Sequence, residues 1–304
     1  MGKLIFPDDI RGGRKIWILA LPFLVVAFFL VGQIVVLLIA KTLGLITRET
    51  VETYPTVLYL ILGSFSLVAL IFVLWLKAFE KSSLASVGLS CSEQSKVLYV
   101  RGYALGLLMG ATAVCGIYLL GGYSLESETD LSLADLVPIL ILMVSFIVQS
   151  GTEEMIFRGW MMSRIAARFG IWVGIIANSL LFALMHVEIG ALQSTAPVMI
   201  VLFAIMTFLF AVFLSLLVVR EKSIWGASAW HAAWNWIFIT WFGLPTTGIE
   251  LGLTPLVADL AVSEGSPEWL TGGLAGPEGS VVTLVILIVG CLILIRRELN
   301  IAKA

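Results

Sequence analysis

Long hydrophobic runs recur along this chain, and they restrict its fold more than any other feature. A helix needs roughly 20 apolar residues to cross the hydrocarbon core of a bilayer. Such runs occupy about residues 16–40, 56–76, 97–120, 136–157, 171–186, 196–219, 224–242 and 280–295. Only 12% of the side chains are charged, whereas soluble domains average about 25%. We therefore predict an all-α, polytopic membrane bundle of about eight transmembrane helices, surrounded by the lipid bilayer.

The distribution of basic residues predicts the orientation of this bundle. With eight spans, sixteen of the eighteen Lys and Arg residues fall on one side of the membrane, and only Lys41 and Arg48 fall on the other. Cytoplasmic segments carry such an excess, so we expect a multi-pass protein of the cell membrane with both termini in the cytoplasm. The first run is too long for the apolar core of a signal peptide, which makes it an uncleaved first helix.

This layout divides the chain into four regions. They are a cytoplasmic arm over 1–15, three N-terminal transmembrane helices over 16–135, a helical core over 136–242, and an extracytoplasmic loop with the last transmembrane helix over 243–304. The loop from 243 to 279 is rich in Gly and Pro, and loops of this length are usually functional or disordered. With a net charge of -2 and no basic stripe, the chain is not expected to bind nucleic acid.

Ionisable residues interrupt the fourth run in the stretch GTEEMIFRGW, which contains Glu153, Glu154 and Arg158. Each such group costs on the order of 3 kcal/mol in the bilayer centre, so a cluster there indicates a functional site. On a helix, Glu154 and Arg158 are four residues apart and can pair. Glu153 then points about 100° away and is free for chemistry. His186 and His231, the only two histidines, also lie in apolar runs, so we expect one shared site.

The depths of these residues predict where the site lies. The fourth run continues to Gly170 as one long helix, which places Glu153 about 20 Å from the cytoplasmic end at 1.5 Å per residue. His186 lies about 20 Å and His231 about 10 Å from the same side. We therefore expect a polar cavity that opens toward the cytoplasm, and a short helix over 171–186 that ends at this cavity.

Each histidine has a partner four residues away, and these pairs suggest the chemistry. Phe182 can pack against the imidazole of His186, while His231 and Asn235 can aim at one point. No nucleophile is poised beside a base, which favours an activated water. Glu153 would take and return the proton, with His186 orienting or sharing it. His231 and Asn235 would donate to the developing oxyanion.

Together, EExxxR (Glu153, Glu154, Arg158), FxxxH (Phe182, His186) and HxxxN (His231, Asn235) resemble the motifs of the CPBP, or Abi-type, family of intramembrane proteases. This family includes CAAX prenyl endopeptidases and bacterial proteins linked to bacteriocin processing and immunity. The resemblance covers about residues 136–240 and implies an intramembrane peptidase that acts on membrane-embedded or lipidated proteins or peptides. It also implies a bacterial source. No HExxH motif occurs, so we predict a metal-free mechanism without a cofactor.

Two other functions remain open at this stage. A zinc protease could use Glu153, His186 and His231 as ligands, since three protein ligands and a water form a catalytic zinc site. The chain could instead be a non-catalytic immunity or scaffold protein, or a proton-coupled transporter. Binding without turnover should survive the isosteric change Glu153→Gln, whereas hydrolysis should not.

Overall fold

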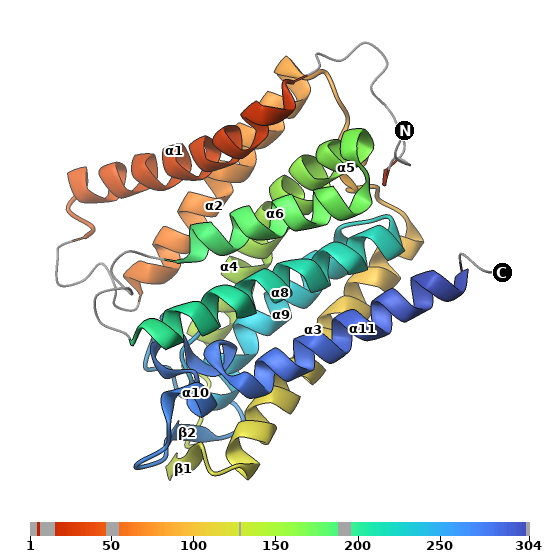
Figure 1. The fold of residues 1–304 in the computed structure, drawn as a ribbon. Helices are drawn as coiled ribbons and strands as arrows, with labels where there is room; N and C mark the ends of the chain where they lie inside the picture. The colour runs from red at the N-terminus through yellow and green to blue at the C-terminus, as the bar shows by residue number, and fades with distance from the viewer. Residues whose placement is uncertain (1–4, 7–15, 47–54, 128, 188–195, 302–304) are drawn as a thin grey trace.

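The structure is a computed structural model that describes residues 5–6, 16–46, 55–127, 129–187 and 196–301. Eight main helices run back and forth between two ends of a bundle (Figure 1). They are α1 (Leu21–Thr42, preceded by the 3₁₀ turn Ile18–Ala20), α2 (Thr56–Leu74), α3 (Glu93–Leu119), α4 (Leu136–Glu154), α6 (Ile171–His186), α8 (Pro197–Glu221), α9 (Trp225–Phe242) and α11 (Val281–Ile301). Each of the eight predicted segments is therefore helical, and the predicted membrane bundle is confirmed.

Six helical stretches in the described part of the chain are long and apolar enough to cross a membrane. They are Ile18–Thr42, Thr56–Phe79, Glu93–Leu119, Leu136–Phe169, Pro197–Glu221 and Gly273–Arg296. The count is thus six where about eight were predicted, because α6 is short and α9 carries too many small and polar side chains. Helices α6 and α9, which are not among these six, contain the two histidines.

Helix α9 lies in the centre of the bundle, with sixteen buried residues among its eighteen. It packs against α3 through Gly102, Gly106 and Gly110, which are four residues apart. A Cβ atom on Gly102 would lie 2.2 Å from the carbonyl oxygen of Gly226, and one on Gly106 would lie 2.5 Å from that of Trp230. Small residues at such spacing let helix backbones approach closely inside membranes. This contact holds α9 in a fixed place between α3 and α4.

The helix that begins at Leu136 continues to Phe169, where Gly170 ends it with a φ of +96°. The predicted single long helix is therefore confirmed, but its middle is not α-helical. Residues Met155–Met162 form a π-helical segment, η4, between α4 and α5 (Ser163–Phe169). Such segments are rare and are often found at functional sites. Here the segment starts directly after Glu154.

The connector between α2 and α3 holds this π-helical segment in place. It follows a second π-helical turn, Trp75–Phe79, and contains the 3₁₀ turn Leu84–Val87. Glu80 is 3% exposed, and it accepts hydrogen bonds from Trp75 Nε1 at 3.0 Å and Trp160 Nε1 at 2.6 Å. It also pairs with Arg164 at 2.5 Å. Buried charges need such partners, so the connector and the π-helical segment form one packed unit.

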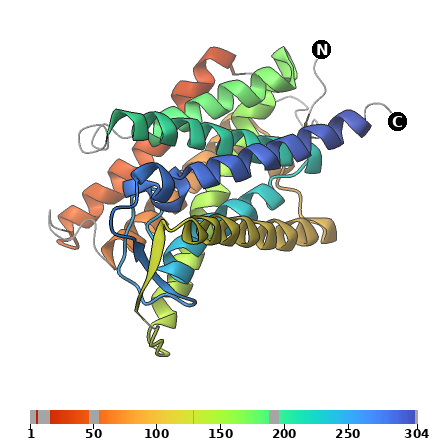
Figure 2. The same ribbon diagram turned by 60° about the horizontal axis from the view of Figure 1, so that its bottom comes forward.

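A small cap covers the opposite end of the bundle (Figures 1 and 2). Strands β1 (Tyr123–Ser127) and β2 (Asp259–Val262) pair antiparallel, and the short helix α10 (Glu268–Thr271) and the 3₁₀ segment η5 (Gly273–Gly279) follow. These elements in 243–279 carry no clear pattern in the sequence and were not predicted. The arm predicted over 1–15 lies outside the described residues, except for Ile5 and Phe6, which are buried.

Candidate active site

Glu154 is the centre of a buried polar cluster that joins α4, η4 and α9. Its Oε1 accepts a hydrogen bond from Arg158 Nη1 at 3.0 Å and lies 2.9 Å from His231 Nδ1. The side chains of Glu154 and Arg158 have no exposed surface. The pairing of Glu154 with Arg158 agrees with the sequence analysis, whereas the contact with His231 was not foreseen.

Glu153 approaches the other nitrogen of the same imidazole. Its Oε2 lies 3.8 Å from His231 Nε2, which is too far for a direct hydrogen bond. Its Oε1 accepts a hydrogen bond from Gln149 Nε2 at 3.4 Å. Among the described residues, Glu153 Oε2 has no hydrogen-bond partner. The imidazole of His231 therefore stands between two carboxylates, one in contact and one separated by a gap.

The two carboxylates face a single guanidinium with spare donors. Arg158 Nε and Nη2 have no hydrogen-bond partner among the described residues. The Arg158 Cζ atom lies 4.3 Å from the centroid of the Phe182 ring, a distance at which a ring attracts a cation. Buried polar groups are usually satisfied, so these unpaired atoms indicate a site that a bound molecule or water would complete.

His186 enters the site from the last turn of α6. Its Nδ1 lies 2.8 Å from the carbonyl oxygen of Phe182, and the two rings stack with centroids 4.1 Å apart. A carbonyl oxygen can only accept, so Nδ1 must carry the hydrogen. In the neutral ring, Nε2 is then an acceptor. Phe182 thus sets both the position and the tautomer of His186, which agrees with the supporting role expected for it.

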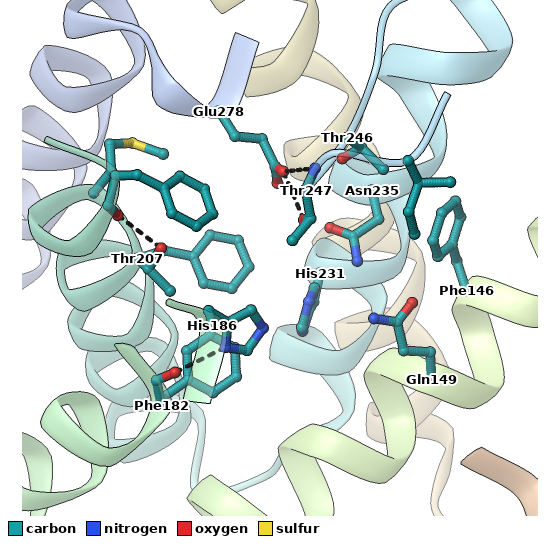
Figure 3. A pocket seen from close by; sticks show the side chains of 14 residues that line it. Phe146, Gln149, Phe182, His186, Thr207, His231, Asn235, Thr246, Thr247 and Glu278 are labelled. Carbon is teal, nitrogen blue, oxygen red and sulfur yellow. Dashed lines mark hydrogen bonds between the residues drawn. The ribbon is translucent and has the colours of Figure 1, made fainter. Parts of the chain in front are cut away.

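A pocket of about 90 Å³ joins these side chains and has room for several waters. Figure 3 shows His186 facing His231 and Asn235 across it. Its lining consists of Phe146, Gln149, Phe182, His186, Phe203, Met206, Thr207, Phe210, His231, Asn235, Thr246, Thr247, Ile249 and Glu278. The two histidines and Asn235 therefore share one pocket, as predicted, and Glu153 and Glu154 approach His231 without lining the pocket themselves.

The lining residues place this pocket nearer the β1–β2 cap than the start of α1. Its walls come from the parts of α4 and α8 nearer the cap, and from Thr246, Thr247, Ile249 and Glu278, which belong to that end. Depths counted along the helices from their cytoplasmic ends could not place the 243–279 segment against the site. An opening toward the cytoplasm stays a prediction.

Several polar lining residues were missed by the sequence analysis, namely Gln149, Thr207, Thr246, Thr247 and Glu278. Gln149 precedes Glu153 by one helical turn, a spacing that could have indicated contact. Glu278 is an acidic residue at the start of an apolar run, which is the kind of position that signals function in a membrane protein. The threonines carry no such signal.

The alternative zinc ligands do not converge in this structure. Within the described ranges, no three His, Cys, Asp or Glu side chains form a group suited to a metal ion, and this includes Glu153, His186 and His231. The metal-free mechanism stays a prediction: purified protein should hold well below one equivalent of zinc by elemental analysis. Stoichiometric zinc that is lost in His186→Ala would support the metalloprotease instead.

The fold and this site define a class: a membrane-embedded helical protein with a buried cluster of acidic, basic and imidazole groups beside a pocket. Residues 135–237 match the family described as type II CAAX prenyl endopeptidase Rce1-like. The match contains all three motifs and confirms the resemblance to the CAAX-type membrane proteases. It covers about one third of the chain. No curated protein matches the sequence.

Proposed function

We propose that this protein is a CAAX-protease-like peptidase that hydrolyses peptide bonds of membrane-associated or lipidated proteins or peptides. The observation that carries the proposal is the 3.8 Å gap between Glu153 Oε2 and Nε2 of His231, a residue that lines the pocket. Two polar atoms at this separation can both bind one water, and Glu153 Oε2 has no other partner among the described residues. The gap is thus suited to a water that is to be activated.

Glu153 acts as the general base on this water. The water oxygen attacks the carbonyl carbon of the peptide bond while its proton passes to Glu153, and the carbonyl oxygen becomes an oxyanion. The C–N bond then breaks, and Glu153 returns the proton to the leaving amine. His186 Nε2, an acceptor that faces the pocket in the neutral ring, can orient or share this proton.

His231 and Asn235 stabilise the oxyanion from α9. Glu154 holds His231 at Nδ1, and in the imidazolium form both ring nitrogens donate, so Nε2 donates first to the water and then to the oxyanion once the water has attacked. That form would also balance the cluster, since two carboxylates then face one guanidinium and one imidazolium. Asn235 lies one turn further along α9 and lines the pocket. One such donor is typically worth about 3 kcal/mol of barrier.

The test compares Glu153→Gln with Glu264→Gln, an exposed carboxylate of the cap. Membrane and secreted peptides from cells that express each protein are compared by mass spectrometry, and a peptide that is released is then assayed with purified protein. We expect Glu153→Gln to lose about 100-fold or more in turnover, because a general base contributes roughly 10² to 10⁴. Full turnover in Glu153→Gln would place the chemistry elsewhere. If wild type and Glu153→Gln bind the same molecules with no cleavage by either, the non-catalytic alternative holds.

A further inference from the structure

The roof of the pocket contains a carboxylate that the proposed hydrolysis does not use. Glu278 is 6% exposed and lines the pocket. Its Oε1 accepts a hydrogen bond from Trp234 Nε1 at 2.9 Å. Its Oε2 accepts two from Thr247, from the backbone N at 2.7 Å and from Oγ1 at 2.8 Å. Figure 3 shows Glu278 beside Thr247 above Asn235.

Close packing of the chain fixes Glu278 in this position. A Cβ atom on Gly276 would lie 2.0 Å from the carbonyl oxygen of Pro245, and Gly276 has a φ of +73°. A Cβ on Gly272, where φ is +91°, would lie 1.7 Å from the carbonyl oxygen of Gly276. Only glycine fits such positions without strain. The glycines before α11 therefore allow close backbone packing, which holds Glu278 against the segment that follows α9.

Among the described residues, no positively charged side chain forms an ion pair with Glu278. Its hydrogen-bond donors are neutral, and the ion pairs found in the described ranges involve other residues. Thr246 lines the same pocket at 1% exposure, and its Oγ1 has no hydrogen-bond partner among the described residues. A buried charge is costly unless it is paired. The roof thus offers two acceptors and one negative charge to a molecule in the pocket.

We propose that Glu278 and Thr246 form a subsite for a positively charged side chain, Lys or Arg, of the peptide in the pocket. This inference rests on the proposed function for the identity of that peptide. A carboxylate has about four lone-pair positions, and three hydrogen bonds leave one for an ammonium or guanidinium N–H. Asn235 lines the same pocket as Glu278 and Thr246, so the subsite shares this pocket with the place assigned to the oxyanion.

Peptide binding tests the subsite without turnover. The protein carries Glu153→Gln, and the probes are fluorescent peptides in detergent micelles that differ only by Lys, Gln or Glu at one position, which is moved along the peptide. At one position we expect the Lys peptide to bind about 10- to 100-fold more tightly than the Glu peptide, the range for a hydrogen bond to a charged group. Equal binding of the Lys and Glu peptides at every position would overturn the proposal.

Variants separate charge from packing. Glu278→Gln should remove most of the Lys preference, and Thr246→Val should lower it by about 10-fold, the lower end of the range for a hydrogen bond to a charged group. Thr247→Ala removes one bond to Glu278 but keeps the charge, and Glu250→Gln changes an exposed carboxylate of the same segment. Both should keep the preference. If Thr247→Ala abolishes it as Glu278→Gln does, Glu278 only braces the roof and the proposal is wrong.

A parallel cleavage assay keeps this inference separate from the proposed function. Protein with Glu153 intact is given the same peptides. A Lys preference in binding together with no cleavage would support the subsite and contradict the peptidase. Cleavage of Lys and Glu peptides at equal kcat/KM, with equal binding, would support the peptidase and contradict the subsite.

Discussion

Glu154 contacts two residues of the site, because it lies against His231 as well as Arg158. One oxygen atom, Oε1, lies 3.0 Å from Arg158 Nη1 and 2.9 Å from His231 Nδ1. Removing one partner of a buried charge pair typically costs about 3–5 kcal/mol, because the other charge stays buried without compensation. Glu154 therefore serves stability and the orientation of His231 at once, while Glu153 keeps one oxygen unpaired among the described residues, as the proposed function requires.

Asn235 provides the sharpest test of the oxyanion assignment. If its amide donates to the oxyanion, Asn235→Ala should raise the barrier by about 2.7 to 4 kcal/mol with little change in substrate binding. Asn235→Asp should be at least as damaging near neutral pH, because a carboxylate repels the oxyanion. It should recover in part as the pH falls, since a protonated acid can donate. The measurement is the pH profile of kcat for both variants, and full activity of Asn235→Asp at pH 8 would rule out the oxyanion role.

At the scale of elements, the π-helical segment and the connector that packs on it support the cluster from the side of the chain ends. A Cβ atom on Gly159 would lie 2.5 Å from the carbonyl oxygen of Val87. Gly159→Ala should therefore push the connector away from η4 and lower stability by about 1–3 kcal/mol, the usual cost of overpacking. We also expect lower peptidase activity, because Glu154 directly precedes this segment and Arg158 lies within it. Thermal unfolding in detergent and the peptide assay measure the two effects.

Gly151 provides the matched control on the same helix. A Cβ atom there would meet nothing within 4 Å, and alanine is the better helix former. Gly151→Ala should leave stability unchanged or slightly raised and activity intact. Equal losses in Gly151→Ala and Gly159→Ala would show that the contact with Val87 is not what matters.

The helices were predictable from the sequence because a helix that lies in lipid needs a long, almost uninterrupted run of apolar residues. The short helix ending at His186 and the long one ending at Gly170 were predictable for the same reason. The hydrogen bonds that complete the site were not. Glu278 meets Thr247 and Trp234 from 31 and 44 residues away, and Trp160 meets Glu80 across 80 residues. Such partners depend on how the segments fold together, which no local pattern records.

At the scale of the whole molecule, the alternation of the helices brings the start of α1 and the end of α11 to one end of the bundle (Figure 1). The excess of basic residues there predicts that this end is cytoplasmic. A reporter enzyme fused after Ala304 should be active in the cytoplasm, and one inserted next to the exposed Glu264 should be active outside. If the first reporter were active outside and the second in the cytoplasm, the orientation would be the opposite, with the pocket nearer the cytoplasm.

The central position of α9 has a consequence for how the protein is made. This helix carries His231 and Asn235, yet it is not among the described helices that are apolar enough to span a membrane. A segment of this kind enters the bilayer poorly by itself and depends on neighbours such as the glycine face of α3. During synthesis, we therefore expect His231 and Asn235 to meet the carboxylates of α4 only after α9 has packed against α3 and α4. Under the proposed function, a chain without α9 lacks the groups that would stabilise the oxyanion, so hydrolysis would start only after this packing step.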